Sequence, residues 1–227
     1  MRFRGVLFDL DDTLTDRHAS LEKAAVAFAR RFGDELLDYE PRAIAQAMRE
    51  TEGKGYRPRL EFFGDLIARL GWKEKVDVGR VADFWETSFA ECSVEREGVT
   101  PLLTRLVAEK VKVGVVTNGI TSIQQRKIDT LGVRRFLESV VVSETAGFSK
   151  PDPRIFRIAL DELGVAPDEC AFVGDHPVND VVGGRDAGMT AVWLAGMHAW
   201  PEGTAEPLLR ISRFAELYEI FGLTAPE

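Results

Sequence analysis

Acidic side chains crowd the end of a short apolar segment near the start of the chain. Residues 6–8 are apolar, and the sequence DLDDT follows them directly at positions 9–13. A short apolar run predicts a buried strand, and alternate residues of an extended segment share a face, so Asp9 and Asp11 are expected to point the same way. Two neighbouring carboxylates resist joint ionisation unless a cation or a shared proton lies between them. One aspartate could simply cap the next helix, but three aspartates within four positions favour a catalytic or metal-binding site.

Further polar residues follow three later apolar segments of the chain. Thr117 and Asn118 follow one segment, Lys150 lies in a loop after the next, and Asp175 and Asp180 come after a third. Taken singly, these residues are better explained as a turn, a solvated surface lysine and a helix cap. Taken together they favour one site, because the carboxyl ends of parallel strands meet at the edge of the sheet where α/β proteins bind ligands.

Apolar runs alternate with helical patterns over most of the chain, which predicts an α/β fold with a doubly wound, mainly parallel sheet. The region between positions 17 and 95 is different, because its apolar residues recur only at helical spacing. We therefore expect an α/β core formed by residues 1–16 and 96–227, and an inserted α-helical domain formed by residues 17–95. The predicted strands of the core are residues 6–8, 111–116, 139–142, 170–173 and 191–194.

Composition limits the classes of function that the chain can have. Its 29 basic and 37 acidic residues give a net charge of −8, which disfavours a broad nucleic-acid-binding surface. No apolar stretch approaches the length of a membrane span, and the first residues run straight into a predicted strand, which leaves no room for a signal peptide. Two cysteines make neither a disulfide framework nor a zinc site. We expect a cytoplasmic protein with no nucleic-acid or membrane partner.

The polar residues resemble, in order, the four motifs of the haloacid dehalogenase-like hydrolases. The matching residues are the DLDDT sequence at 9–13, Thr117-Asn118, Lys150, and Gly174-Asp175 with Asp180. The resemblance covers nearly the whole chain, because the insert after the first strand looks like the helical cap of this family. It implies a Rossmann-like core and the phosphatase branch. Asp12 departs from the pattern, since many relatives carry glycine there.

The resemblance also implies a mechanism in which the first two motif aspartates are catalytic. Asp9 would be the nucleophile that attacks phosphorus and forms an aspartyl-phosphate. Asp11 would act first as the general acid for the leaving alcohol and then as the general base for water. The family's dehalogenases lack an aspartate at the position of Asp11, so its presence here favours hydrolysis of phosphate esters.

The remaining motif residues would bind the metal and the phosphate. The resemblance implies Mg²⁺ held by Asp9, by the backbone carbonyl of Asp11 and by Asp175, with Asp180 supporting a metal-bound water. The transferring phosphoryl group would be bound by Thr117, Asn118 and Lys150.

The expected substrate is a small soluble phosphate ester of the sugar phosphate or nucleotide type. A phosphomutase of the same family remains an alternative, because it uses the same acid–base aspartate. A phospho-acceptor signalling module also uses aspartates, a lysine and Mg²⁺, but it would be shorter and would lack the helical insert. The glycine-rich fingerprints of nucleotide-binding proteins are missing from the sequence.

Basic residues of the insert are candidates for contacts with the part of the substrate that does not react. The conspicuous candidates in the insert are Arg17, His18, Lys54, Tyr56, Arg57 and Arg59. We select Lys54, Arg57 and Arg59, which lie in and beside a glycine-containing loop. A solvated basic loop is an equally good interpretation, since long charged side chains normally stay in water.

Overall fold

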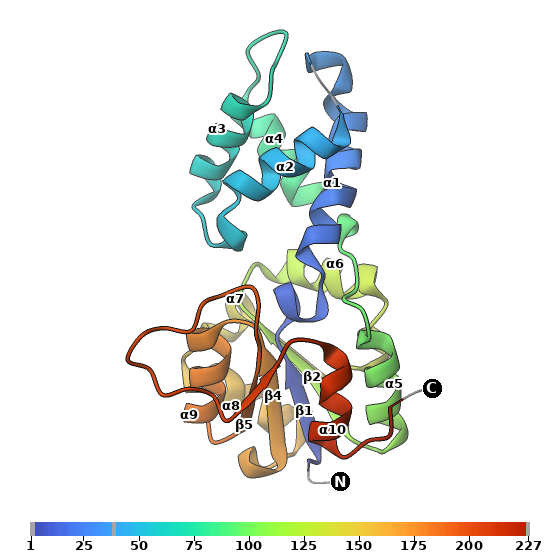
Figure 1. The fold of residues 1–227 in the computed structure, drawn as a ribbon, viewed down its shortest axis with the longest axis vertical. Coiled ribbons are helices and arrows are strands. Elements are labelled where there is room, and N and C mark those ends of the chain that lie inside the picture. The colour runs from blue at the N-terminus through green and yellow to red at the C-terminus, as the bar shows by residue number, and fades with distance from the viewer. Residues whose placement is uncertain (1–2, 38–39, 226–227) are drawn as a thin grey trace. The chain divides into compact units, whose positions relative to one another are not determined.

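The computed structural model describes residues 3–37 and 40–225, and it divides the chain into two compact units. One unit consists of residues 1–16 and 95–227, and the other of residues 17–94. The first contains all strands of the described sheet, and the second is built from helices. Each unit is described separately below (Figure 1).

A six-stranded, fully parallel sheet forms the centre of the α/β unit, in the order β3-β2-β1-β4-β5-β6 (Figure 1). The first strand lies in the middle, paired with β2 on one side and β4 on the other. Because all strands run the same way, their carboxyl ends share one edge. The strands are β1 (Gly5–Phe8), β2 (Lys112–Thr117), β3 (Ser139–Val142), β4 (Cys170–Gly174), β5 (Thr190–Leu194) and β6 (Leu209–Ile211).

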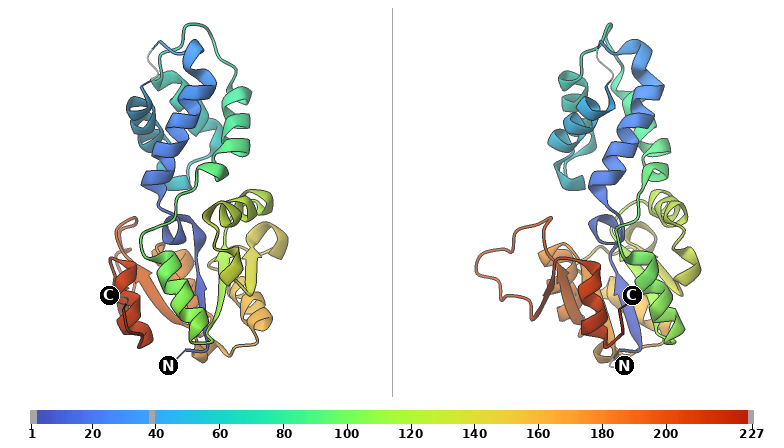
Figure 2. Two further views of the ribbon diagram at one scale, coloured as in Figure 1. Left: turned by 90° about the vertical axis from the view of Figure 1, so that its right-hand side faces the viewer. Right: turned by 45° about the vertical axis from the view of Figure 1, so that its right-hand side comes forward.

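Helices cover both faces of this sheet and bury alternate side chains of its strands. On one face, visible in the left view of Figure 2, α5 and α10 pack over Val6 and Phe8. On the other face, α8 packs over Leu7 and Phe172. The helices of this unit are α5 (Val99–Ala108), α6 (Thr121–Leu131), α7 (Ser143–Ala146), α8 (Pro153–Leu163), α9 (Gly183–Asp186) and α10 (Leu217–Phe221). The predicted doubly wound α/β architecture is confirmed.

Local sequence signals explain where several of these elements begin and end. An aspartate followed by a proline predicts a helix start at residues 152–153, and α8 begins there. The Asp152 carboxylate accepts a hydrogen bond from the backbone N–H of Arg154 at 2.9 Å. The five predicted strands all form, within two residues of their expected bounds. Two expectations differ from the structure. The helical pattern after the fourth predicted strand favours one helix over residues 178–188, but the structure has a wide turn (Pro177–Val182) followed by the short α9. Strand β6 was not predicted.

The described part of the other unit is built from the α-helices α1 (Arg17–Phe32), α2 (Pro41–Thr51), α3 (Arg59–Arg69) and α4 (Val78–Ser88). They enclose an aromatic core of their own, in which Phe28 lies 5.1 Å from Phe84, and Phe62 lies 4.6 Å from Trp85, between ring centroids. Burying one such aromatic side chain contributes about 1.5–3 kcal/mol, so these contacts stabilise the unit internally. Helix α2 was not predicted.

No helix within the described ranges has both the length and the apolar character that a membrane crossing requires.

Candidate active site

The candidate site begins where the two central strands end. Asp9 follows β1 and Asp175 follows β4, and the backbone N–H of Asp9 donates to the carbonyl oxygen of Val173 at 2.9 Å. The parallel pairing of β1 with β4 places Phe8 opposite Val173. The pairing register therefore brings the first and the last motif together at one point on the carboxyl edge.

Three buried carboxylates meet there around one buried ammonium group. Asp9, Asp175 and Asp180 each present an oxygen, and these atoms all lie within 4.8 Å of one another. Lys150 donates to Oδ1 of Asp9 at 2.5 Å and to Oδ1 of Asp180 at 2.7 Å. All four side chains are buried. We call Asp9, Asp175 and Asp180 the acidic cluster.

Burial and crowding shift the protonation of this cluster strongly. Burial raises the pKa of Asp9 to about 7, although Lys150 lowers it, and the neighbouring Asp180 raises it further. Burial also raises the pKa of Asp175 to about 9, helped by the charges of Asp9 and Asp180. Although burial alone lowers the pKa of Lys150, the carboxylates of Asp180 and Asp9 raise it above its ordinary value. One lysine therefore does not balance the cluster, which favours a further cation.

Asp180 is fixed in the cluster by a close approach to the backbone. Its Oδ2 accepts a hydrogen bond from the backbone N–H of His176 at 2.8 Å. A Cβ at position 174 would lie 2.4 Å from the Cβ of Asp180, so only glycine fits at the end of β4. The glycine of the Gly174-Asp175 motif is therefore required because a larger residue would collide with Asp180.

Lys150 reaches the cluster from a loop that is held by Asn118. The Asn118 side chain accepts a hydrogen bond from the backbone N–H of Lys150 at 2.8 Å and donates to its carbonyl oxygen at 3.0 Å. The side-chain amide of Asn118 therefore positions Lys150. Since the side chain of Asn118 binds the Lys150 backbone, its backbone N–H is the group that would bind phosphate, and this role remains a prediction. Thr117, at the end of β2, is buried, and its hydroxyl oxygen accepts from Gln124 at 2.7 Å.

The Asp11 carboxylate takes part in a different set of contacts. Lys127 of α6 donates to its two oxygens at 2.7 and 2.8 Å, and Gln124 donates to Oδ2 at 2.9 Å. Neither residue was predicted from the sequence. The only signal was their spacing, three residues apart on a helix that follows Thr117-Asn118.

The loop that carries Asp11 has an unusual backbone that explains the departure at Asp12. Asp12 has a φ of 62°, in the left-handed region that glycine adopts most readily and that aspartate tolerates better than most residues. Arg96 holds this loop by donating to the carbonyl oxygens of Thr13 at 2.9 Å and Asp12 at 2.7 Å. A glycine or an aspartate can therefore serve at position 12.

Two further residues flank Asp175 and were also missed. The indole N–H of Trp193 donates to the backbone carbonyl oxygen of Asp175 at 2.9 Å. Nε2 of His198 lies 3.5 Å from Oδ2 of the same aspartate. His198 belongs to the long segment between β5 and β6, which extends away from the sheet (Figure 2).

The three basic residues predicted to contact substrate lie in the helical unit and make contacts there. Lys54 occupies a tight turn with a φ of 55°. Arg57 donates to the carbonyl oxygen of Thr51 at 3.1 Å and pairs with Asp65. The Arg59 guanidinium lies 5.9 Å from the ring centroid of Trp85. Their part in substrate binding remains a prediction.

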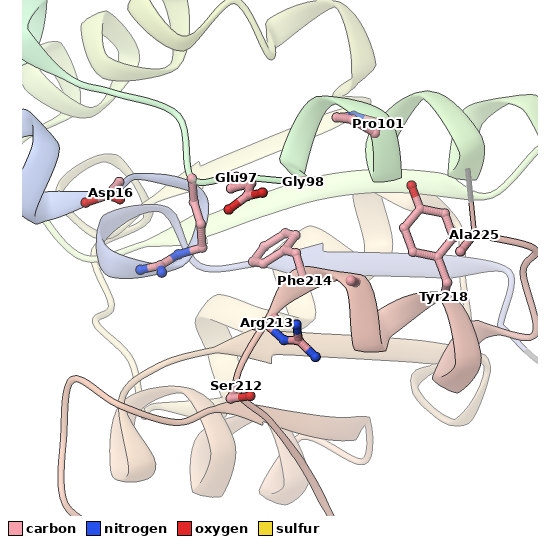
Figure 3. Close-up of a pocket in the computed structure, with 11 residues that line it drawn as sticks. Asp16, Glu97, Gly98, Pro101, Ser212, Arg213, Phe214, Tyr218 and Ala225 are labelled. Carbon is pink, nitrogen blue, oxygen red and sulfur yellow. The ribbon is translucent and has the colours of Figure 1, made fainter. Parts of the chain in front are cut away.

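A cavity of about 440 Å³ lies elsewhere in the α/β unit. The side chains of Phe214 and Tyr218 point toward α5, which carries Pro101, and the charged residues Glu97 and Arg213 also line the cavity (Figure 3). Among the described residues that line this cavity, none is a predicted site residue. The acidic cluster is thus a separate site.

Comparison with known proteins assigns the family. A model of the haloacid dehalogenase-like hydrolases matches residues 3–188. This range covers most of the chain, so the protein belongs to that family and is an enzyme of the hydrolase class. The family predicted from the four motifs is confirmed.

Several relatives are similar along nearly their full length. The chain is 28% identical to pyrimidine 5'-nucleotidase YjjG of Escherichia coli, covering 97% of this chain and 98% of that protein. It is 30% identical to a phosphoserine phosphatase of Thermus thermophilus (94% and 97%) and 32% identical to a glyceraldehyde 3-phosphate phosphatase of Methanopyrus kandleri (83% and 82%). These names support the predicted phosphatase branch.

Solved structures share the fold at lower identity. The putative HAD-hydrolase YfnB of Bacillus subtilis, described as bound to magnesium, superposes with a TM-score of 0.74 at 22% identity, covering 98% of this chain and 100% of that one. The L-2-haloacid dehalogenase of Xanthobacter autotrophicus has a TM-score of 0.70 at 16% identity, covering 98% and 100%. These similarities confirm the fold.

Proposed function

We propose that the protein is a cytoplasmic, Mg²⁺-dependent phosphomonoester hydrolase that works through an aspartyl-phosphate on Asp9. The observation that carries this proposal is the buried acidic cluster with Lys150 at the carboxyl edge of the sheet. Relatives that are named as phosphatases or a nucleotidase support the same reaction class.

The residues present fit a magnesium ion. The acidic cluster offers only oxygen ligands, which Mg²⁺ prefers, and its charge exceeds that of Lys150. Asp9, Asp175 and the backbone carbonyl of Asp11 would hold the ion, and Asp180 would support it. Bound Mg²⁺ would neutralise negative charge on the substrate phosphate.

In the first half of the reaction, a carboxylate oxygen of Asp9 attacks phosphorus while the bond from phosphorus to the ester oxygen breaks. The leaving oxygen takes a proton from Asp11. In the second half, Asp11 takes a proton from water, whose oxygen attacks phosphorus and releases Asp9 and inorganic phosphate. The Lys150 ammonium group and the Thr117 hydroxyl stabilise charge on the phosphoryl oxygens.

The proposed substrates are small metabolites of the sugar phosphate or nucleotide type. The nucleotidase similarity over nearly the whole chain and the triose phosphate phosphatase similarity each support one of these types. A phosphomutase would use the same two aspartates and is the alternative within the family. A phospho-acceptor signalling module is disfavoured by the match to a hydrolase family.

Removal of divalent metal is expected to abolish turnover. Protein treated with a chelator should not hydrolyse p-nitrophenyl phosphate, and added Mg²⁺ should restore the rate, because the acidic cluster lacks balancing charge without the ion. Asp175→Asn should raise the Mg²⁺ concentration that gives half-maximal rate, whereas Asp168→Asn, an exposed aspartate on the turn before β4, should not. Full activity after chelation would contradict the metal site.

A panel of phosphate monoesters assayed with Mg²⁺ would identify the substrate type.

We further propose that the insert, residues 17–95, acts as a cap that selects the substrate through Lys54, Arg57 and Arg59. Their positive charges would suit the polar part of a phosphate ester that does not react. Replacing all three by alanine is expected to change the ranking of substrates in the monoester panel, measured as kcat/KM. Turnover of p-nitrophenyl phosphate, which offers few such contacts, should change little.

A matched variant removes three exposed positive charges elsewhere in the helical unit, at Arg30, Arg42 and Lys75. It should leave the ranking unchanged. If replacing Lys54, Arg57 and Arg59 slows every substrate by one common factor, or changes none of the rates, the loop does not select the substrate.

A further inference from the structure

Helix α6 carries two polar side chains that are almost completely buried. Gln124 is 2% exposed and Lys127 is 7% exposed, although most lysines and glutamines lie at the surface. Burial of a charged group is costly unless it is paired and hydrogen-bonded. The contacts that compensate for this cost therefore indicate what the two residues do.

Both side chains contact the Asp11 carboxylate. Lys127 donates to both oxygens, and Gln124 donates to Oδ2. The same amide nitrogen of Gln124 also donates to the hydroxyl oxygen of Thr117 at 2.7 Å. Gly119 leaves room for this amide, since a Cβ there would lie 3.0 Å from both Cγ and Cδ of Gln124. Three donor contacts on one carboxylate restrict both of its side-chain torsions.

Asp11 remains partly accessible while it is held in this way. Its side chain is 28% exposed, whereas the side chain of Asp9 is 9% exposed. A carboxylate that is held by donors and still partly exposed is suited to give a proton to the leaving group and then to take one from water. The contact with Thr117 ties this carboxylate to a residue that we expect at the phosphate.

We propose that Lys127 and Gln124 are positioning residues, which orient the Asp11 carboxylate toward the leaving group. Gln124, which contacts both Asp11 and Thr117, also fixes the position of this carboxylate relative to the phosphate. This inference rests on the proposed phosphatase reaction. A displacement of about 1 Å can cost about 100-fold in rate, so loss of the Lys127 contacts has a large expected effect. A purely structural ion pair between α6 and the Asp11 loop is the competing explanation.

A double-mutant cycle separates the two explanations. The variants are Lys127→Met, Asp11→Asn and their combination, assayed with Mg²⁺ on an alkyl phosphate and on p-nitrophenyl phosphate. Lys127→Met should lower kcat/KM for the alkyl phosphate by about 100-fold, with a smaller loss for the aryl phosphate, whose leaving group needs no proton. KM should change only a few-fold. In the Asp11→Asn background, Lys127→Met should have no further effect, because its partner is already disabled.

Two further variants keep the test decisive if Lys127→Met does not fold. Lys127→Arg retains the charge and should recover most of the alkyl phosphate rate. Gln124→Met should lower kcat/KM for the alkyl phosphate more than for the aryl phosphate. Arg126→Met changes an exposed residue of the same helix and should leave both rates unchanged.

Equal losses from Lys127→Met with and without Asp11, or equal losses for both substrates, would overturn the inference in favour of a structural ion pair. If the wild-type protein shows no Mg²⁺-dependent turnover of either ester, the proposed function fails instead. The two failures are therefore distinguishable.

Discussion

Replacing Asp9 by asparagine is expected to abolish turnover of every phosphate monoester. The amide is a poor nucleophile, so no covalent bond to phosphorus forms and the acid–base chemistry of Asp11 has nothing to act on. We expect a rate at the assay background with p-nitrophenyl phosphate and Mg²⁺. Mass spectrometry of acid-quenched wild-type protein during turnover should show one added phosphoryl group, and the Asp9→Asn variant should show none.

The variant is expected to fold, because Lys150 keeps its contact with Asp180 at 2.7 Å when Asp9 loses its charge. Its melting temperature should therefore be close to that of the wild type. Asp12→Asn is the matched control from the same loop: it makes the same chemical change, and asparagine accepts the φ of 62° at this position. Asp12→Asn should retain turnover within a few-fold. Persistent turnover and labelling in Asp9→Asn would remove Asp9 as the nucleophile.

The meeting of Asp9, Asp175 and Lys150 could be predicted from sequence because topology brings the ends of parallel strands to one edge. Each of these residues directly follows a short apolar run or lies in the loop after one. Their convergence therefore required only the identification of strands and the rule that ligands bind at the carboxyl ends. The strand β1 is central in the sheet, so its end adjoins those of both β2 and β4.

The contacts of Asp11 could not be predicted in this way. Lys127 is 116 positions from its partner, and on a helix it looks like an ordinary solvated lysine. The direction of a side chain on a helix such as α6 depends on how that helix crosses the sheet, which the sequence pattern does not fix. The part that Asn118 plays in holding the Lys150 backbone could not be predicted either, since only the structure brings the two residues together.

Two elements escaped prediction because their apolar signals are short. Strand β6 has three residues, LRI, and follows a long segment after β5 at the edge of the sheet. An edge strand of this length gives almost no alternation to detect. Helix α2 has Pro41 in its first turn, but its buried face includes two small alanines, Ala45 and Ala47, which hide the periodicity.

Metal-free protein is expected to lose stability as pH rises from 7 to 9. Burial raises the pKa of Asp175 to about 9 in the folded state, from an ordinary value of 3.8. Between these values the folded state binds a proton that the unfolded state lacks, so the free energy of unfolding falls with rising pH. One such proton corresponds to a slope on the order of 1 kcal/mol per pH unit. Asp9, with a pKa of about 7, acts in the same direction at the lower end of this window.

Mg²⁺ should reverse this trend, because it binds the deprotonated carboxylates. Thermal or urea unfolding in chelator should give a free energy of unfolding that declines from pH 7 to 9, and saturating Mg²⁺ should stabilise the protein more at pH 9 than at pH 7. The window lies above the titration of His176, whose pKa burial lowers, so that group does not contribute. Asp175→Asn should flatten the slope in chelator, and Asp168→Asn should preserve it. A metal-free stability that rises over this window would show that Asp175 is ionised in the folded protein without a cation, and that Lys150 alone balances the cluster.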